Sequence, residues 1–202
     1  MNEYYFAPVY DVLLHPFIHK LRKRVAQLAK HYHAKSVIDM CCGTGHQIKY
    51  LNSANIDAAG VDLNDMMLQQ ASKSSEKTQC KKGDASQTEY PDSRFDMAMT
   101  TLSLHEMPAD TARSVIKEMI RITQPSGSLM LIDYDFTDRS SKFMKTALKA
   151  IEYFVGGDHY RNFRKYLASG QMEFLTGDLN LEITETHYFF GKTVALRIFR
   201  KI

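Results

Sequence analysis

The chain has 202 residues, a length typical of one domain with a sizeable buried core. Its 44% hydrophobic and 24% charged residues are ordinary for a globular protein, and a net charge of +3 is too small to indicate a polyanionic partner. Three cysteines provide neither a disulfide framework nor a paired Cys-x-x-Cys metal spacing, which favours a cytoplasmic protein. The first residues have no signal-peptide pattern, and we find no run of about 20 apolar residues to span a membrane.

The first 33 residues combine an aromatic segment with a basic helix. Residues 1–16 are rich in tyrosine and contain Pro8 and Pro16, so they predict an irregular segment. From Phe17 to about Tyr32, apolar residues recur at helical spacing and predict an amphipathic helix. The other side of this helix is basic, a pattern that usually marks a solvated face: His19, Lys20, Arg22, Lys23 and Arg24.

Residues 35–65 follow the order strand, glycine turn, helix, strand and acid. An apolar strand ends at Asp39, and Gly43 and Gly45 then allow a tight turn that brings backbone N–H groups close to a ligand. A helical spacing follows, so the glycines lie at a strand-to-helix corner, where free N–H groups attract an anion. The second apolar strand ends on Asp62, which is placed to accept both hydroxyls of a ribose. The stretch therefore predicts a nucleoside pocket.

The next elements alternate between strands and helices, as in a parallel α/β sheet. Residues 79–82 have a poor strand propensity, and their prediction as a strand depends on the Gly-Asp-Ala sequence that follows at residues 83–85. Residues 95–100 form an apolar run that is typical of a central strand. Pro108 suits the first turn of a helix, which is expected to stop before the turn residues 124–127. A fifth strand is predicted over 128–134.

Residues 136–170 predict two helices beyond the fifth strand. One face of the first is apolar: Phe143, Ala147, Ile151 and Phe154. Gly156 and Gly157 break this helix, and Asp158 is suited to cap the second. Two β-rich runs follow at the end of the chain, over 181–190 and 193–201, and predict an antiparallel hairpin.

The glycine turn resembles a motif of a known family. Val-Ile-Asp-Met-Cys-Cys-Gly-Thr-Gly, residues 37–45, resembles the first motif of class I S-adenosyl-L-methionine (SAM) methyltransferases. It is most similar to the quinone C-methyltransferase-like members, of the methyltransferase domain 11/25 type. One departure is Cys41, where the family usually has Gly or Ala. Residues 83–85 resemble the third motif and residues 101–107 the fourth. The resemblance implies a Rossmann-like, doubly wound α/β sheet of seven strands with a C-terminal antiparallel hairpin.

The resemblance also implies which residues bind the cofactor, SAM, and its product S-adenosyl-L-homocysteine. Asp39 would help to hold the methionine ammonium, Asp62 would bind the ribose, and Asp84 would accept a hydrogen bond from the adenine amino group. Thr100 and Thr101 would lie near the sulfonium. The full set of implied cofactor residues is Asp39, Cys41, Gly43, Gly45, Asp62, Leu63, Met66, Asp84, Ala85, Thr100 and Thr101.

Candidates for catalysis and for acceptor binding come from three regions of the chain. His105 is the best candidate for a general base, because an unperturbed imidazole has a pKa near neutrality. Tyr10 lies in a segment that folds over the cofactor in similar methyltransferases, so it is a candidate for both roles. Tyr134, His159 and Tyr160 are further candidates on the acceptor side. The eight histidines predict no metal site.

We expect one methyltransferase domain over residues 1–202. Its expected parts are an N-terminal lid and helix (1–33), a SAM-binding core (34–135), a helical insertion on the acceptor side (136–170), and a terminal helix turn and hairpin (171–202).

The predicted function is SAM-dependent methylation of a small molecule, with a quinone-like or other apolar aromatic acceptor preferred. An amine or a lipid head group fits the same cofactor half, and peripheral membrane contact is expected if the acceptor is a lipid or a quinone. A non-catalytic SAM-binding module stays open. A dehydrogenase is disfavoured by Ile48, which occupies the position of the third glycine in the dinucleotide fingerprint. No nucleic acid partner is expected, because residues 100–103 lack an Asn/Asp-Pro-Pro-Tyr signature.

Overall fold

A computed structural model describes the backbone of residues 7–74 and 79–202, and the side chains of these residues except 7–17 and 74. The helices are α1 (Ala7–His31), α2 (His46–Ser53), α3 (Asp65–Ser74), α4 (Ala109–Ile122), α5 (Lys142–Val155), α6 (Gly157–Ser169) and α7 (Gln171–Thr176), with a short 3₁₀ helix η1 (Leu104–Glu106). The strands are β1 (Ser36–Met40), β2 (Asp57–Asp62), β3 (Gln79–Lys82), β4 (Phe95–Thr101), β5 (Thr123–Tyr134), β6 (Leu181–Phe189) and β7 (Val194–Lys201).

The strands form one sheet in the order β3-β2-β1-β4-β5-β7-β6. The strands β1 to β5 are parallel, whereas β7 is antiparallel to both β5 and β6. The strand order reverses between β1 and β4, which is the place where open α/β sheets bind ligands at the carboxyl ends of their strands. The sequence thus correctly predicted the sheet, its seven strands and the terminal hairpin.

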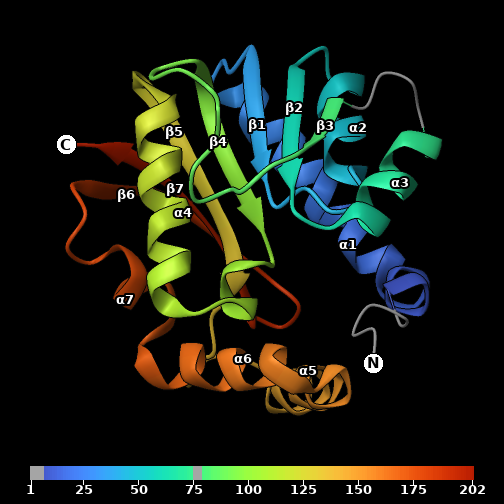
Figure 1. Ribbon diagram of the computed structural model, residues 1–202. Coiled ribbons are helices and arrows are strands. Elements are labelled where there is room, and N and C mark those ends of the chain that lie inside the picture. Colours follow the sequence, from blue (N-terminus) through green and yellow to red (C-terminus); the bar gives the residue numbers. More distant parts are fainter. Residues whose placement is uncertain (1–6, 75–78) are drawn as a thin grey trace.

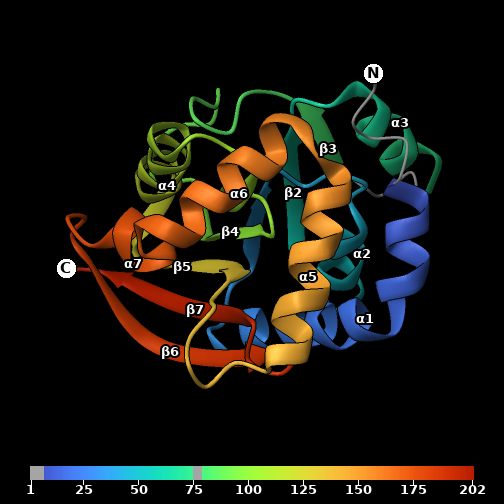
Figure 2. The same cartoon turned by 90° about the horizontal axis from the view of Figure 1, so that it is seen from below.

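Helices cover both faces of the sheet and its carboxyl edge. α4 packs on β4 and β5 on one face, and α1 and α2 lie on the other (Figure 1). α5 and α6 lie across the carboxyl ends of the strands, as the view from below shows (Figure 2). α6 also packs against η1, which follows β4. The predicted acceptor-side helices therefore form a cap over the edge where the predicted cofactor residues end their strands.

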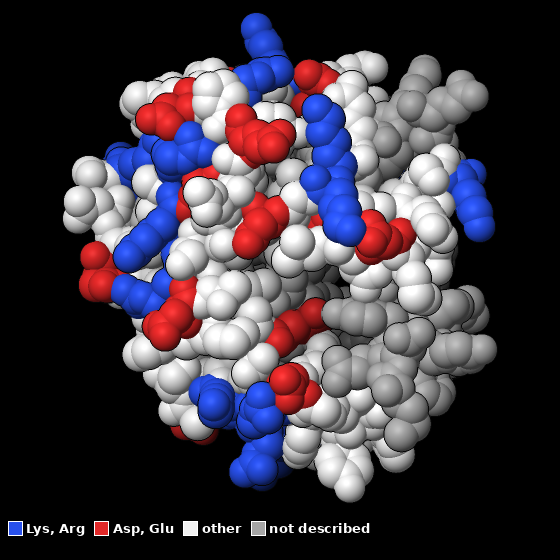
Figure 3. All heavy atoms as spheres, in the orientation of Figure 1, with Lys and Arg blue, Asp and Glu red and all other residues white. Residues whose placement is uncertain are grey.

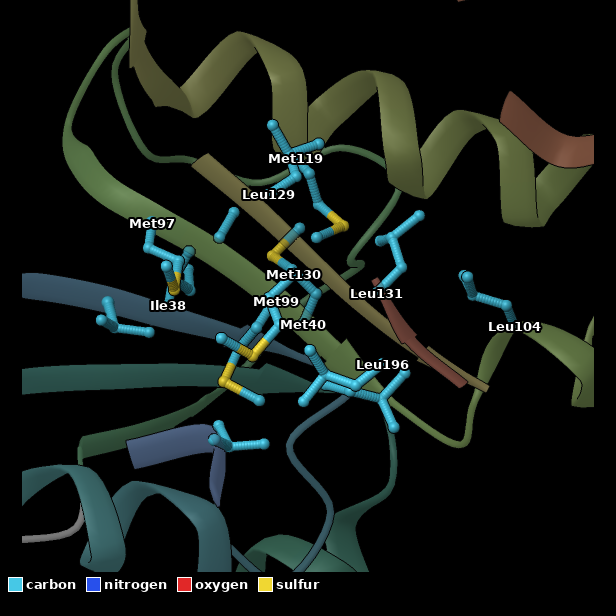
Figure 4. Close-up of a cluster of buried hydrophobic side chains, with 14 of the residues drawn as sticks. Ile38, Met40, Met97, Met99, Leu104, Met119, Leu129, Met130, Leu131 and Leu196 are labelled. Atoms are coloured by element: carbon cyan, nitrogen blue, oxygen red, sulfur yellow. The ribbon is translucent and has the colours of Figure 1, made fainter. Parts of the chain in front are cut away.

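Methionine is prominent in the core around the central strands. Met40, Met97, Met99 and Met130 come from β1, β4 and β5, and each is at most 1% exposed (Figure 4). Met119 joins them from α4. Because the methionine side chain is unbranched and adaptable, it can fill irregular gaps between a twisted sheet and a helix. This packing fixes the strand ends on which the site is built.

Gly60 of β2 allows the glycine turn to pack closely against the sheet. A Cβ at this position would lie 2.6 Å from both Cys42 Cβ and Ile48 Cδ1. We expect Gly60→Ala to lower the free energy of unfolding by about 1–3 kcal/mol, the usual cost of overpacking a core. Urea denaturation measures this change. Gly83→Ala is the control, because a Cβ there would meet Val61 only at 3.8 Å. Equal stability of the two variants would contradict the packing argument.

Two predicted element boundaries were wrong. α1 begins at Ala7 rather than near Phe17, and it continues through Pro16. Figure 2 shows that this helix changes direction along its length, which an internal proline explains. β5 begins at Thr123, which pairs with Phe95, and the next pair joins Met97 to Ser128. The predicted turn residues 124–127 therefore form an irregularity within β5 rather than a loop before it.

Two details of the cap also differ from the prediction. α6 is capped by Gly156, and Asp158 lies in its first turn, where it pairs with Arg161 at 2.8 Å. On α5, Phe143 and Phe154 are each 79% exposed, and the buried residues are Leu148 and Glu152. The spacing of the aromatic residues therefore identified the helix but not the side that packs on the sheet.

Candidate functional site

The glycine turn and the end of β2 are joined by short hydrogen bonds. The backbone N–H of Gly43 donates to Asp62 Oδ2 over 2.7 Å, and the N–H of Cys42 donates to the Val61 carbonyl over 3.0 Å. Gly43 and Gly45 have φ angles of 53° and 67°, in the left-handed region that favours glycine. The two glycines are therefore required by the backbone path, and this path brings the turn against the carboxylate predicted to bind ribose.

Cys41 takes the same left-handed conformation without being glycine. Its φ angle is 65°, a region that is uncommon for residues with a Cβ and that is found at strained, functional positions. Burial and the nearby Asp62 carboxylate raise the pKa of its thiol to about 12. A hydrogen bond with Ser103 lowers this pKa, but by less than the other two effects raise it. The thiol is thus protonated at neutral pH and acts as a small side chain in the turn rather than as a nucleophile.

Asp62 is held in place by the main chain on both oxygens. Besides the Gly43 bond, Asp62 Oδ1 accepts from the N–H of Asn64 over 2.8 Å. A carboxylate can accept about four hydrogen bonds, so acceptor positions are left for a diol. Beyond Asp62, Leu63 is 63% exposed and Met66 46% exposed, although both are large apolar residues. Their exposure beside a fixed acid suits the predicted contact with a flat base.

Asp84, the third predicted acid, is more exposed to solvent than Asp39 and Asp62. Asp84 follows β3 and is exposed, with Oδ1 accepting from the N–H and the hydroxyl of Ser86. The neighbouring Ala85 is 5% exposed. The backbone N–H of Gly83 donates to the Asp62 carbonyl over 3.1 Å, so the two strand ends are tied together. The loop after β3 therefore lies next to the predicted ribose position.

Two buried polar atoms at this edge have no hydrogen-bond partner among the described residues: Asp39 Oδ1 and Thr101 Oγ1. Asp39 is only 3% exposed, and burial raises its pKa to about 7, with Asp62 adding to the rise and Arg22 opposing it. An unsatisfied buried polar group costs free energy, so such groups in native proteins call for an explanation. A bound molecule with a cationic or hydrogen-bonding group would supply it, and the ammonium of SAM fits Asp39.

The end of β4 turns sharply beneath the cap. Leu102 has a φ of 53°, and its N–H donates to the Ile132 carbonyl over 2.7 Å. The hydroxyls of Thr100 and Ser103 lie 2.5 Å apart. Figure 3 shows a hollow in this face of the molecule at the level of the strand ends, with an acidic side chain beside it. Among the described residues of this face, acidic and basic side chains are otherwise interspersed, with no large patch of one sign.

His105 lies in η1 and is 2% exposed. Its Nδ1 lies 2.6 Å from Asp133 Oδ1, and Asp133 Oδ2 accepts from the N–H groups of Leu104 and His105. Burial by itself would lower the pKa of His105, but the adjacent Asp133 carboxylate and its hydrogen bond raise it to about 9. The role of His105 as a base stays a prediction, with the imidazole enclosed between carboxylates rather than open to the hollow.

Two residues of the cap, Glu152 and His159, and Tyr134 at the end of β5 lie around His105. Glu152 Oε1 lies 3.7 Å from His105 Nε2 and accepts from the Tyr134 hydroxyl over 2.6 Å. Glu152 Oε2 lies 2.5 Å from His159 Nε2. Of the predicted acceptor-side residues, the structure thus brings Tyr134 and His159 together with His105. Tyr134 is 1% exposed, so it is enclosed rather than presented to an acceptor.

Tyr160 packs among aromatic side chains. Tyr160 is half-buried, and its ring packs on Tyr153 and Phe163 at centroid distances of 5.4 and 6.3 Å. The backbone of Tyr10 belongs to α1, but its side chain lies outside the described residues, as does the start of the predicted lid. The lid and the role of Tyr10 stay predictions.

Sequence reasoning missed two acids near His105 as site residues. Glu152 is the one acid of α5, and it lies on the buried side next to Leu148. Asp133 is the last residue but one of β5 and is fully buried. An acid within a helical apolar stripe, and an acid at a strand end opposite a histidine, were the available signals. The pairing itself depends on which elements the fold brings together.

None of the helices in the described part of the chain combines the length and apolar character that a membrane crossing requires.

The chain is similar in sequence to known methyltransferases. A family model described as a methyltransferase domain matches residues 37–127. An uncharacterized methyltransferase from Synechocystis is 28% identical over 99 residues, which are 49% of this chain and 47% of that protein. A demethylmenaquinone methyltransferase from Thermotoga maritima is 27% identical over 177 residues, which are 84% of this chain and 76% of that protein. This chain thus spans about half the length of the Synechocystis relative.

The solved structure of a SAM-dependent methyltransferase from Aquifex aeolicus has the same fold. The two superpose with a TM-score of 0.61 at 15% identity, over 87% of this chain and 88% of the other. The fold class predicted from the sequence is confirmed, and the family match supports SAM as the cofactor. The chain thus matches a methyltransferase domain model over residues 37–127, and it has the fold of a SAM-dependent methyltransferase of known structure.

Proposed function

We propose that this chain transfers the methyl group of SAM to a small-molecule acceptor. In this reaction the bond between sulfur and the methyl carbon breaks as a bond to the acceptor nucleophile forms, and S-adenosyl-L-homocysteine leaves. The observation that carries the proposal is the arrangement of Asp39 and Asp62 at neighbouring strand ends, above a turn that needs left-handed backbone. One acid is buried and unsatisfied, and the other is fixed by the turn itself.

Each proposed cofactor contact uses a group with a matching chemistry. Asp62 would accept the two ribose hydroxyls, and Asp39 would pair with the methionine ammonium. Leu63 and Met66 offer apolar surface for adenine, with Asp84 at its edge. The hydroxyls of Thr100 and Thr101 would lie near the sulfonium. Holding donor and acceptor in line can supply about 7–11 kcal/mol of the barrier, so catalysis rests mainly on position.

The acceptor proposed is apolar and aromatic, of the quinone type. Support comes from the name of the Thermotoga maritima relative, a demethylmenaquinone methyltransferase. Further support comes from Tyr160 of the cap, an aromatic residue that is only half-buried. A carbon or phenol oxygen that loses a proton during transfer needs a base, and a base adds about 10²–10⁴-fold.

Incubation of the purified protein with SAM labelled in its methyl group tests the proposed activity. We expect label to appear in the organic extract when a reduced quinone lacking its ring methyl group is added. Transfer to an amine or a lipid head group instead would support the methyltransferase activity and contradict the quinone-type acceptor. SAM binding without transfer to any of these acceptors would favour a non-catalytic SAM-binding module.

Peripheral contact with a membrane is part of the proposal for a lipid-soluble acceptor. Phe143, Tyr153 and Phe154 are 62–79% exposed on α5, with Lys142 and Lys149 exposed on the same helix. Aromatic and basic side chains on one helix suit an anionic lipid surface. Co-sedimentation with vesicles that contain an anionic lipid tests this contact, and loss of binding in Phe154→Ser would support it. Absence of the native protein from the vesicle pellet would remove the contact from the proposal.

We expect Asp39 to release a proton when SAM binds. With a pKa of about 7 in the free protein, Asp39 is mostly protonated at pH 6. An adjacent ammonium stabilises the ionised form and lowers this pKa, so close to one proton should leave on binding at pH 6. Calorimetry in buffers with different ionisation enthalpies measures this proton. Asp39→Asn, which cannot titrate, is the control, and an equal buffer dependence in both proteins would contradict the assignment.

A further inference from the structure

We propose that His105, Glu152 and His159 form a binding site for a divalent transition-metal ion beneath the cap. The three residues come from η1, α5 and α6, and they meet only because the cap lies over the carboxyl end of β4. Each offers a ligand atom, and these atoms all lie within 4.8 Å of one another. The site is separate from the acids assigned to the cofactor, so it goes beyond the proposed transfer reaction.

The distances suit one shared ion. Bonds from zinc to imidazole nitrogen or carboxylate oxygen are about 2.0–2.2 Å, so two ligand atoms of one ion lie about 3–4 Å apart. His105 Nε2 and Glu152 Oε1 are 3.7 Å apart, within this range. His159 Nε2 is 2.5 Å from Glu152 Oε2, so it would move away slightly as the ion enters. His159 is the ligand best able to move, because its side chain is 15% exposed and the other two are 2% exposed.

A second layer of contacts orients two of these ligands. Asp133 Oδ1 lies 2.6 Å from His105 Nδ1, which leaves Nε2 directed toward Glu152. The Tyr134 hydroxyl donates to Glu152 Oε1 over 2.6 Å. A carboxylate or other acceptor on the far nitrogen of a ligating histidine is the usual partner in metal sites, where it fixes the tautomer and raises basicity. His105 and Glu152 are therefore held in place before any ion binds.

The charges around the cluster favour a cation. Three carboxylates, those of Glu106, Asp133 and Glu152, surround the two imidazoles, with Glu106 Oε2 3.9 Å from His159 Nδ1. In the metal-free protein a proton on His105 balances part of this negative charge, and a metal ion would take the place of that proton. Two nitrogen ligands and one carboxylate select ions such as Zn²⁺ rather than Mg²⁺ or Ca²⁺, which prefer oxygen. The same set, two histidines and a glutamate, holds zinc in known catalytic sites.

Titration of the metal-free protein with Zn²⁺ in a calorimeter at pH 8, without SAM, tests the site. We expect one ion to bind per chain, and we expect zinc to raise the melting temperature, because the ion joins the cap to the loop after β4. Tyr134→Phe, which removes only an orienting hydroxyl, should weaken binding about 10–100-fold. His159→Ala and Glu152→Gln remove ligands and should weaken binding further. Co²⁺ should show a visible d–d absorption band in the native protein and not in His159→Ala.

His187→Ala is the matched control. His187 Nε2 lies 2.5 Å from Glu185 Oε1, so this pair has the same groups at the same distance without the third ligand of the cluster. The control should bind zinc like the native protein. Absence of zinc binding to the native, folded protein would overturn the proposal, and so would equal binding by native protein and His159→Ala. Because no SAM is present, neither result depends on the proposed transfer reaction.

Discussion

Replacement of Asp133 with alanine is expected to lower the free energy of unfolding by about 3–5 kcal/mol, the usual cost of breaking a buried ion pair. Asp133 is fully buried and contacts His105 at 2.6 Å. Its other oxygen accepts two backbone N–H groups, which alanine would leave without a partner. The loss should be measured by denaturant unfolding in metal-free buffer.

The control for this change is Asp178→Ala. Asp178 also pairs with a basic residue, Arg113, but its side chain is 67% exposed, so water can replace the lost contact. We expect a much smaller loss of stability from this variant. If Asp133→Ala and Asp178→Ala were equally stable, the buried pair would not contribute the stability assigned to it.

The same pair predicts a pH dependence of stability. An ordinary histidine has a pKa of 6.5, and Asp133 raises that of His105 to about 9 in the folded protein. Because the folded state holds the proton more tightly, the extra stability is complete below pH 6.5 and is lost as the pH rises to 9. Unfolding measured between these values should show this decline in native protein and a flatter profile in Asp133→Ala.

Replacement of Asp62 with alanine is expected to weaken SAM binding by about 1.5–3 kcal/mol, which is about 10- to 150-fold, as charge-assisted hydrogen bonds are lost. Asp62 would bind the ribose, and it also fixes the turn through the Gly43 N–H. Alanine removes both functions, so the effect belongs at the upper end of the range. Calorimetry with SAM measures the change, and circular dichroism checks that the variant is folded.

Asp65→Ala is the control for Asp62. Asp65 is an exposed acid only three positions further along, where it pairs with Lys82 at 2.6 Å on the surface. Its loss should leave the affinity for SAM unchanged. A folded Asp62→Ala protein with native affinity would remove the ribose assignment.

The cofactor half of the site could be predicted because it is local in sequence. Gly43 and Gly45 are needed by the backbone path of one turn, and Asp62 ends the next strand, so a single short stretch carries the pattern. The order of apolar runs then determines the sheet, since parallel strands place their carboxyl ends on one edge. The sequence also identified Cys41 as a departure from the family motif, but only the structure showed that its backbone is left-handed.

The cap could not be predicted in the same way because its contacts join distant segments. His105 and Asp133 come from successive strand ends, whereas Glu152 and His159 come from helices whose packing face the sequence did not determine. The exposed Phe143 and Phe154 misled the assignment of that face, because aromatic spacing does not distinguish a buried stripe from an exposed one.

The crystal structure of the protein with S-adenosyl-L-homocysteine tests the central claim most directly. We expect the ribose hydroxyls on the Asp62 carboxylate, the amino group of the ligand beside Asp39, and the adenine between Met66 and the loop that carries Asp84. Ligand density away from these strand ends, or in a pose that leaves both Asp39 and Asp62 without contact, would contradict the account.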